Sequence, residues 1–146
     1  MTDENPLLNP HNYPVNVTEK LRYNDTDRQG HINNAVFATL CESGRCAFLY
    51  DPGNPLVSEE AQFVIAKLTI NFLGEMNWPG EVVIGTGVAR IGRTSFGLTQ
   101  GLFVDQQCVA TCESVIVLMD VDTRQSTALP EDTIKKLEKL SVKTEV

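Results

Sequence analysis

Residues 33–50, NNAVFATLCESGRCAFLY, form the stretch that decides the fold. An asparagine at 33 or 34 supplies an N-cap, and apolar side chains then occupy most of the circumference of a helix that ends near Tyr50. We expect such a helix to lie buried at the centre of the molecule. Gly44 in its interior costs up to about 1 kcal/mol relative to alanine, which indicates a place where the backbone of the sheet approaches the helix closely.

Alternating apolar and polar residues on both sides of this helix predict strands. Because no helix separates the last four of them, we expect those four to pair as antiparallel neighbours. The fold class is therefore α+β, one long helix against a five-stranded antiparallel sheet. The expected strands cover Val15 to about Tyr23 and residues 66–72, 81–91, 94–104 and 108–121, with a last helix from Pro130 to about Leu140.

The chain has the length and composition of one ordinary globular domain. Three prolines within residues 1–14 predict a loose N-terminal arm ahead of a single domain over residues 15–146. A formal net charge of −7 argues against nucleic acid and anionic membranes as partners, since both favour a basic surplus. No apolar run reaches the length of a membrane span and the N-terminus has no signal pattern, so we expect a cytoplasmic protein.

The cysteines and histidines do not predict a metal site. Cys41 and Cys46 do not converge on one side of a helix, and the chain has only 2 histidines. Cys108 and Cys112 are expected on one face of a strand, too far apart for local bonding. We therefore expect small buried thiols and neither metal nor other cofactor.

One long helix covers only one face of the sheet, so other surfaces of the sheet must be shielded from solvent in another way. The face opposite the helix and at least one strand edge remain open. Association through a sheet edge is the economical solution, so we expect a homodimer or a homotetramer.

The densest cluster of functional groups lies in the loop that leads into the long helix. Residues 23–34, YNDTDRQGHINN, contain two carboxylates, one imidazole and several carboxamides. The first turn of a helix has free backbone N–H groups and a partial positive charge, so it can polarise a carbonyl. A carboxylate upstream could attack that carbonyl or deliver water to it. Turn formation and helix capping use the same residue types and are the alternative explanation.

The same loop resembles the signature of a known family. The pattern Tyr23-x-Asp25-Thr26-Asp27-x-x-Gly30-His31-x-Asn33-Asn34, followed by Glu42-x-x-Arg45, is similar to that of the 4-hydroxybenzoyl-CoA thioesterase branch of the hotdog-fold acyl-CoA thioesterases. The resemblance extends from about Val15 to Pro130, with weaker matches over residues 92–95 and 120–130. It implies the hotdog fold, a long central helix wrapped by a five-stranded antiparallel sheet. It also implies hydrolysis of an acyl-CoA thioester, with CoA as part of the substrate.

The resemblance assigns roles to residues of the loop. It implies that Asp27 is the catalytic carboxylate, as nucleophile or as general base on water. It also implies that the N–H of Asn34 polarises the thioester carbonyl, in agreement with the helix-terminus argument. His31 either contacts substrate or holds the loop, and both roles stay open. The other candidate substrate-binding residues here are Tyr23, Gly30 and Asn33.

Two candidates outside the loop also have structural alternatives. Glu42 lies about two turns into the helix on nearly the same face as Asn34, and other hotdog branches use a helix carboxylate as base. An ion pair between Glu42 and Arg45 is its structural alternative. A turn further along resembles the strand end that borders the pantetheine arm and phosphates of CoA in the family, often across a subunit boundary. Its candidates, which could equally be solvated turn residues, are Arg90, Arg93, Thr94 and Ser95.

Two other functions stay open on the sequence alone. A hotdog protein can be a hydratase acting on acyl thioesters, although Asp27 and His31 match that motif poorly. It can also be a non-catalytic module that binds acyl-CoA or another small molecule, because a fold does not fix a function. The acyl group is not determined by the sequence.

Overall fold

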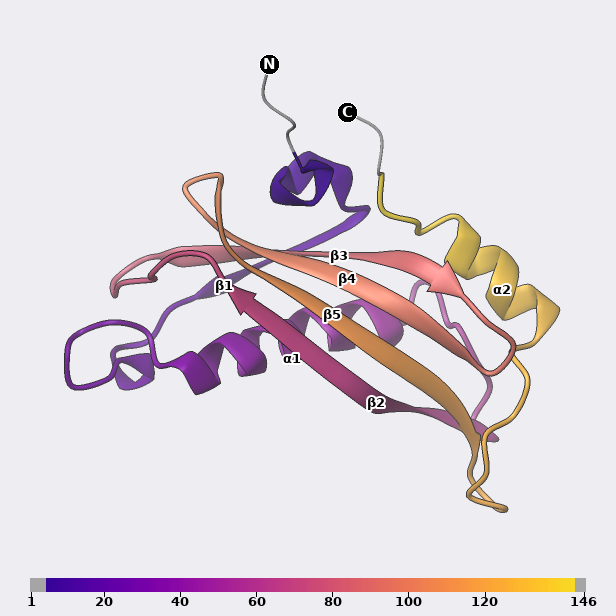
Figure 1. Ribbon diagram of the computed structural model, residues 1–146. Helices are drawn as coiled ribbons and strands as arrows, with labels where there is room; N and C mark the ends of the chain where they lie inside the picture. The colour runs from indigo at the N-terminus through magenta and orange to yellow at the C-terminus, as the bar shows by residue number, and fades with distance from the viewer. Residues whose placement is uncertain (1–4, 144–146) are drawn as a thin grey trace.

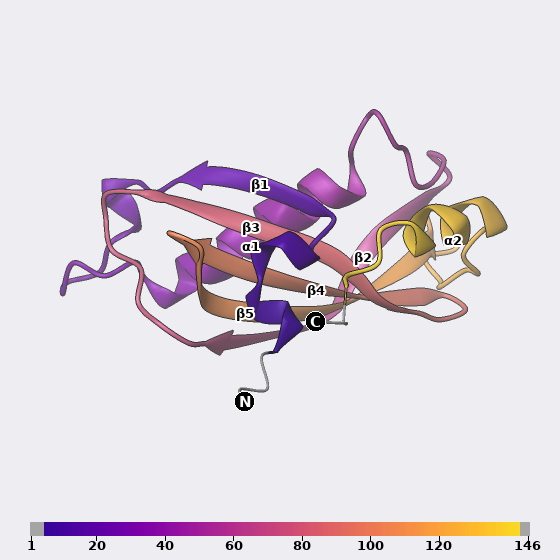
Figure 2. The same cartoon turned by 90° about the horizontal axis from the view of Figure 1, so that it is seen from above.

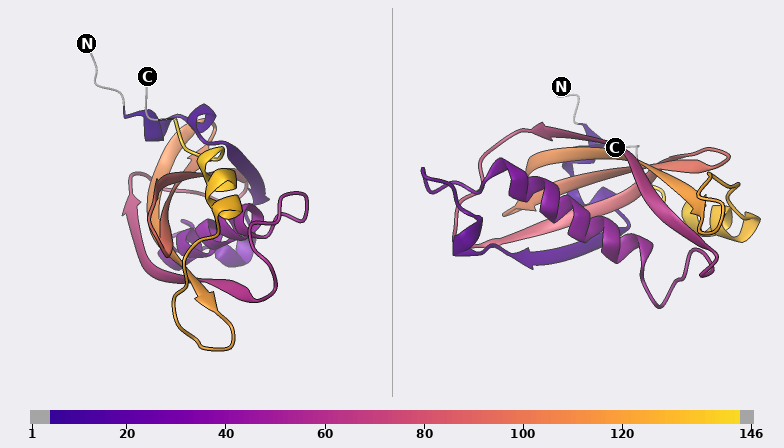
Figure 3. Two further views of the ribbon diagram at one scale, coloured as in Figure 1. Left: turned by 90° about the vertical axis from the view of Figure 1, so that its right-hand side faces the viewer. Right: turned by 90° about the horizontal axis from the view of Figure 1, so that it is seen from below.

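One long helix lies across the concave face of a single antiparallel sheet (Figure 1). The computed structural model describes residues 5–143. Viewed from the side, the sheet curves around helix α1 (Asn34–Leu49) (Figure 3). The predicted α+β hotdog architecture is confirmed. The remaining elements are β1 (Val15–Lys20), β2 (Ala61–Phe72), β3 (Glu81–Ile91), β4 (Ser95–Val104), β5 (Gln107–Asp120) and α2 (Glu131–Glu138).

The strands lie in the order β1-β3-β4-β5-β2. The prediction that strands adjacent in the sequence pair with each other is therefore confirmed for β3 with β4 and for β4 with β5. It is wrong for β2 with β3, because β2 pairs with β5. After β2 the chain does not turn back as a hairpin; the Ile32 N–H bonds to the Met76 carbonyl at 2.8 Å. This contact ties residues 73–80 to the loop before α1 and carries the chain to the far side of the sheet. As a result β1 and β2 are the two edge strands.

Helix α1 begins and ends where the sequence predicts. The Asn33 side chain accepts a hydrogen bond from the Ala35 N–H at 2.9 Å and caps the helix. Its buried residues face the sheet, but Thr39, Glu42 and Cys46 are exposed, so the expected burial around most of the helix holds for one side only. No helix within residues 5–143 is long and apolar enough to cross a membrane.

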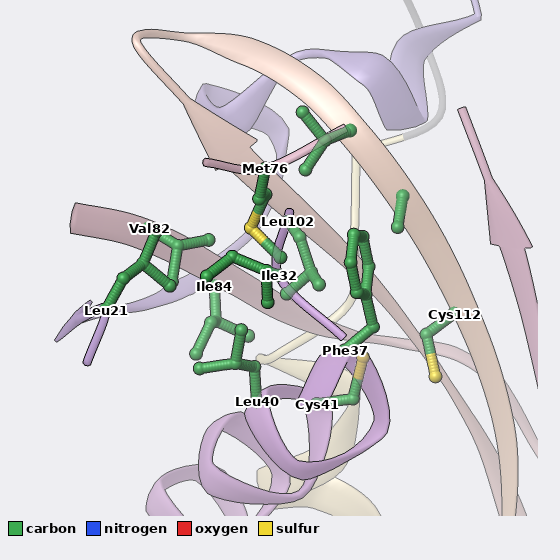
Figure 4. Close-up of a cluster of buried hydrophobic side chains, with 12 residues drawn as sticks. Leu21, Ile32, Phe37, Leu40, Cys41, Met76, Val82, Ile84, Leu102 and Cys112 are labelled. Atoms are coloured by element: carbon green, nitrogen blue, oxygen red, sulfur yellow. The ribbon is translucent and has the colours of Figure 1, made fainter. Parts of the chain in front are cut away.

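The core between α1 and the sheet consists of two buried clusters. The first surrounds the N-terminal half of α1 and includes Phe37, Leu40 and Cys41 (Figure 4). The second surrounds its C-terminal half, where Phe48 packs with Phe96 and their neighbours. The two clusters hold α1 at both ends, which fixes the position of the loop that precedes it.

The N-terminal arm lies on the convex face of the sheet (Figure 2). Contrary to the expected loose segment, residues 5–14 form two short 3₁₀ turns, Pro6–Leu8 and Pro10–Asn12, capped by Asn5 and Asn9. Tyr13 then packs edge-on against Phe103, with ring centroids 5.9 Å apart. Prolines at the first position of each turn favour this arrangement because their fixed φ suits a helical start. Residues 1–4 of the predicted arm lie outside the described residues.

The cysteines do not all lie where expected. Cys41 and Cys112 are buried, but Cys108 is half-buried and Cys46 is exposed. A register shift in the β4–β5 pair leaves Val109 without a partner on β4. Because such a bulge reverses the alternation of side chains, Cys108 faces the convex side while Cys112 faces α1.

Candidate active site

The loop before α1 is a closed turn. The Asp27 N–H donates to the His31 carbonyl at 2.7 Å, and the Gly30 N–H donates to the Asp27 carbonyl at 3.2 Å. Gly30 has a φ of 84°, in the left-handed region that favours glycine. An added Cβ at Gly30 would meet no atom within 4 Å. Glycine is therefore required here for its backbone conformation, and the loop surface above it is open.

Asp25 is the structural carboxylate of the loop. It is 5% exposed and accepts hydrogen bonds from the Arg22 N–H at 2.9 Å and from the Arg22 guanidinium at 3.0 Å. Burial by itself raises the pKa of Asp25, but the backbone and side-chain hydrogen bonds from Arg22 outweigh it and lower the pKa below its ordinary value. Both carboxylate oxygens are engaged within the loop.

Asp27, two residues further on, is exposed and only half engaged. Its Oδ1 accepts hydrogen bonds from the Gln29 N–H at 2.8 Å and from the His31 N–H at 3.1 Å. Over residues 5–143, Oδ2 has no hydrogen-bond partner. One oxygen therefore fixes the carboxylate and the other is left free.

Asp27 borders a cavity of about 450 Å³ at the N-terminal end of α1. One wall is the loop and the first turn of α1, and the other is the C-terminal end of β2 with residues 73–75. Phe37 of α1 and Phe72 of β2 meet edge-on in its lining, with ring centroids 5.1 Å apart. Phe72 and Leu73 are 50% and 54% exposed, so the apolar side of the cavity opens at the free edge of β2.

The first turn of α1, at the edge of this cavity, has an unpaired backbone donor within residues 5–143. The Asn33 side chain binds the Ala35 N–H, and the Asn33 carbonyl accepts from the Val36 N–H at 2.9 Å. Within the described chain the Asn34 N–H has no acceptor, and Asn34 lines the cavity with Asp27. Because the N-terminus of a helix carries a partial positive charge, this position favours an oxyanion or a polarised carbonyl.

His31 is tied to the opposite wall of the cavity. Its Nε2 lies 3.3 Å from the Oε2 of Glu75, and the His31 backbone bridges to Asn77. Glu75 was missed by the sequence reasoning. No local pattern could have found it, because the contact joins positions 44 residues apart through a non-local bridge.

Tyr23 and Glu42 do not line the cavity. Tyr23 is 73% exposed and packs edge-on against Trp78, with ring centroids 5.2 Å apart. Glu42 faces a separate groove between α1 and β2. The ion pair of Glu42 with Arg45, its structural alternative, is absent from residues 5–143, because the Arg45 side chain turns inward to Gln100.

The turn between β3 and β4, which carries the four candidates over residues 90–95, lies at the other end of the sheet from the loop before α1 (Figure 1). Strand β3 has 11 residues, which span about 33 Å at ~3.3 Å per residue. Its first residue, Glu81, pairs with Lys20 beside the loop, and its last, Ile91, leads into the turn. One chain therefore does not bring the loop and this turn onto one cavity.

The thiol of Cys41, beside the loop in the chain, does not supply a nucleophile. Contact with the Cys112 thiol and burial together raise the pKa of Cys41, so Cys41 stays protonated and unreactive. Over residues 5–143, no group of three or more His, Cys, Asp or Glu side chains is arranged to hold a metal ion.

The sequence profile of the thioesterase-like superfamily matches residues 21–137, from the residue after β1 to the last turn of α2. The chain belongs to the thioesterase-like superfamily. The match includes the loop, α1 and all strands from β2 to β5. Both walls of the cavity are thus parts of the chain that the superfamily shares.

Known structures share the fold of this chain, and a curated relative is named as a thioesterase. The PA5185 protein of Pseudomonas aeruginosa superposes with a TM-score of 0.83 at 20% identity, covering 94% of this chain and 99% of that one. A thioesterase of Thermus thermophilus, crystallised with coenzyme A and zinc, has a TM-score of 0.74 at 24% identity, covering 88% and 95%. At these identities the two structures support the fold. An acyl-acyl carrier protein thioesterase of Arabidopsis thaliana, the chloroplastic ATL2, is 27% identical over 106 residues. That match covers 69% of this chain and 56% of the relative, so the chain spans little more than half the relative's length.

Proposed function

We propose that the protein hydrolyses an acyl-CoA thioester to a free acid and coenzyme A in the cavity at the start of α1. The observation that carries this proposal is the state of Asp27: two amides hold Oδ1, and Oδ2 has no partner among residues 5–143. Asn34, whose N–H has no acceptor within the described residues, lines the same cavity. A fixed carboxylate and an unpaired helix N–H are the two groups that attack on a thioester carbonyl requires.

The reaction follows from these two groups. The carbonyl oxygen accepts a hydrogen bond from the Asn34 N–H, and one such donor stabilises an oxyanion by about 3–4 kcal/mol. In the nucleophilic route, Asp27 Oδ2 bonds to the carbonyl carbon, the C–S bond breaks and CoA leaves as its thiolate. Water then cleaves the mixed anhydride and restores the carboxylate. In the general-base route, Asp27 takes a proton from the water that attacks the same carbon, the C–S bond breaks, and the proton passes from Asp27 to the departing CoA thiolate.

Coenzyme A and acyl carrier protein are the two thiol carriers to be compared. The family resemblance and the coenzyme A in the Thermus structure support a CoA ester. The Arabidopsis relative is named for acyl-acyl carrier protein, which makes that carrier the second candidate.

We place the reaction in the cytoplasm, because all four cysteines are free thiols and such thiols suit a reducing compartment.

We also propose that a second copy of the chain binds at the free edge of β2. Phe72 and Leu73 are exposed there beside the cavity, and an open edge strand is a ready site for strand pairing. If a two-fold axis relates the two copies, their β2 strands pair in antiparallel orientation. The Phe72 end of one β2 then lies beside the Ala61 end of the other. In each chain the Ala61 end lies on the side of the 91–95 turn, since Val64 pairs with Val117 and Val117 with Ser95. The turn of the partner would thereby approach the Asp27 loop.

The test is thiol release from CoA esters of short, medium, long and aromatic acids, and from the matching acyl carrier protein esters. Asp27→Asn should lower kcat by about 100-fold or more while the fold is retained. Asp122→Asn, at an exposed carboxylate in the turn after β5, is the matched control and should leave kcat unchanged.

Three outcomes contradict parts of this proposal. An Asp27→Asn variant within about threefold of the wild type would move the catalytic role to Glu42. Saturable binding of CoA esters without turnover would indicate a binding module. Loss of the enoyl absorbance of crotonyl-CoA without thiol release would indicate a hydratase.

A further inference from the structure

A cavity on the convex face of the sheet lies apart from the proposed active site. It has a volume of about 420 Å³, a size typical of sites for small molecules, and we call it the convex-face pocket. Strands β2, β3, β4 and β5 form its floor, while Leu7 of the N-terminal arm and Val142 of the segment after α2 border it. Both segments lie on the side of the sheet opposite α1 (Figures 1 and 2). None of the lining residues comes from the Asp27 loop.

Hydrogen bonds hold the border of the pocket in place. The Tyr13 hydroxyl donates to the Leu7 carbonyl at 2.8 Å. The Lys143 N–H donates to the Asn12 carbonyl at 2.9 Å, which ties the segment after α2 to the arm. Leu7 and Val142 therefore have fixed positions beside the floor. The pocket is a preformed part of the fold, as sites for small molecules commonly are.

Two β-bulges place a positive charge at each side of the floor. A bulge in β2 brings Lys67 into register with Val115 of β5, and a bulge in β3 brings Arg90 into register with Gly97 of β4. Val115 and Gly97 pair with each other, so the two cations stand at the ends of one row across four strands. Because Ile116, next to Val115, packs in the core toward α1, this row lies on the convex face. Bulges commonly redirect a side chain beside a functional site.

The charged side chains of the pocket do not neutralise one another. Gly97 gives Arg90 the space to lie along the sheet, since a Cβ at Gly97 would come within 3.0 Å of Arg90 Cγ and 3.4 Å of Nε. Glu113 is the one carboxylate in the lining. Over residues 5–143, Lys67, Arg90 and Glu113 form no ion pair with each other or with any other residue. Two cations and one carboxylate leave one positive charge in excess, which favours a ligand with a single negative charge.

A buried hydroxyl in the floor also lacks a partner. Thr99 is 3% exposed, and its Oγ1 has no hydrogen-bond partner within the described part of the chain. The Tyr13 hydroxyl lies beside it, but donates its proton to the Leu7 carbonyl. Leaving a buried hydroxyl unpaired is unfavourable. Thr99 therefore indicates that a polar group of a ligand completes the pocket.

We propose that the convex-face pocket binds a small carboxylic acid with an apolar body. The carboxylate balances the excess charge of Lys67 and Arg90 and accepts a hydrogen bond from Thr99. The apolar body then packs against Leu7 and Val142. A phosphate monoester fits less well, because it brings nearly two negative charges to a site with an excess of one positive charge. This binding is independent of the proposed hydrolysis and of the proposed second copy.

The first experiment compares an acid with its neutral amide. Calorimetric titration of the wild type with hexanoate should show saturable binding of one molecule per chain, and hexanamide should bind at least about tenfold more weakly. Lys67→Gln, at an exposed position, should raise the Kd for hexanoate at least about tenfold. Lys135→Gln, an exposed lysine of α2 outside the pocket, is the matched control and should leave the Kd unchanged. Equal binding of hexanoate and hexanamide overturns the proposal, as does an unchanged Kd in Lys67→Gln.

The second experiment separates a binding role of Thr99 from a structural one. Thr99→Val removes a hydroxyl that has no partner in the described chain, so without acid its melting temperature should equal or exceed that of the wild type. Hexanoate should raise the melting temperature of the wild type, because a ligand stabilises the state that it binds. This rise should be smaller in Thr99→Val. A rise as large in Thr99→Val as in the wild type overturns the proposal.

The outcomes also distinguish the pocket from other surfaces of the molecule. Binding of hexanoate that Asp27→Asn changes and Lys67→Gln does not would assign the acid to the active-site cavity and overturn the proposal. No binding to the wild type, with altered sedimentation of Lys67→Gln, would make this face a contact between copies and overturn it as well.

A series of acids identifies the source of the ligand. Tightest binding of the acid whose CoA ester is hydrolysed fastest supports the pocket as a site for the product of the proposed hydrolysis. Tightest binding of an acid whose ester is not hydrolysed supports the pocket as a site for an acid from another reaction. Binding that depends on Lys67, in a protein that hydrolyses no thioester, would support the pocket and overturn the proposed hydrolysis alone.

Discussion

The two aspartates of the loop before α1 differ in environment although one residue separates them. Asp25 is buried and holds Arg22 through its backbone and its side chain. Asp27 is exposed, with one oxygen fixed by amides of the loop. A carboxylate whose oxygens are both engaged stabilises the loop, whereas a carboxylate with a free oxygen on a cavity is available for chemistry. Stability and activity should therefore depend on different members of this pair.

Asp25 should make the stability of the protein depend on acid pH. Its pKa in the folded state is lowered, so the stability it contributes is present above the unfolded pKa of about 4. That stability is lost as pH falls through the folded pKa. Urea unfolding should therefore give a lower free energy of unfolding for Asp25→Asn than for the wild type at pH 7. This difference should become smaller below about pH 4. A difference in the free energy of unfolding that does not change with pH would contradict the hydrogen bonds assigned to Asp25. Asp105→Asn, at an exposed turn, is the control.

The sequence could predict the residue types of this site but not all their partners. The local pattern around Asp27 and Asn34 predicts a loop and a capped helix start, because both depend on neighbours in the chain. The contact of His31 with Glu75 depends instead on how residues 73–80 return to the loop. For the same reason the inward turn of Arg45 was unforeseeable, since it depends on Gln100, 55 positions away.

At the scale of elements, α1 lies tightly against the sheet at Gly44. A Cβ there would contact the side chain of Ile84 and come within 2.8 Å of Gln100 Nε2 and 3.2 Å of Thr86 Oγ1. Sequence reasoning expected this approach. The surface that approaches consists of side chains of β3 and β4 rather than backbone. Gly44 therefore sets the distance between α1 and the sheet, and with it the position of the helix N-terminus at the cavity.

Gly44→Ala should destabilise the protein in spite of the better helix propensity of alanine. Overpacking a filled core costs about 1–3 kcal/mol, which exceeds the gain of up to about 1 kcal/mol from replacing glycine in a helix. At the exposed Ala47 of the same helix, Ala47→Gly should be destabilising, so the preference for glycine reverses between the two positions. The free energies of unfolding of Gly44→Ala, Ala47→Gly and the wild type, measured by chemical denaturation, test this prediction. A Gly44→Ala variant as stable as the wild type would show that the neighbouring side chains move aside freely.

The boundaries of elements were more predictable than their pairing. Alternation identified β3 over residues 81–91 as the structure has it, because alternation is a local property. Strand β2 begins earlier than expected, at Ala61, since its bulge at Ala66 interrupts the alternation. The pairing of β2 with β5 could not be predicted, because the connection over residues 73–80 gives no local sign that it crosses to another edge.

At the scale of the whole molecule, the loop before α1 and the 91–95 turn lie at opposite ends of the sheet. A two-fold contact through β2 would bring the turn of one copy toward the loop of the other. Both groups of sequence candidates can then serve one substrate, Asp27 at the thioester and the partner's Arg93 at the phosphates. Guanidinium donors match phosphate oxygens in geometry and charge. An active site shared in this way requires association for activity.

Mixing two inactive variants tests this shared site. Asp27→Asn removes the carboxylate, and Arg93→Glu should lower kcat/KM for CoA esters at least about tenfold by opposing the phosphates. In a mixed dimer one site combines the intact Asp27 of one copy with the partner's intact Arg93, while the other site carries both changes. After subunit exchange about half of the dimers are mixed, so kcat/KM should recover to about a quarter of the wild-type value. If both groups instead served a site within one chain, each site would keep its own defect on mixing, and activity would remain at the mean of the two variants.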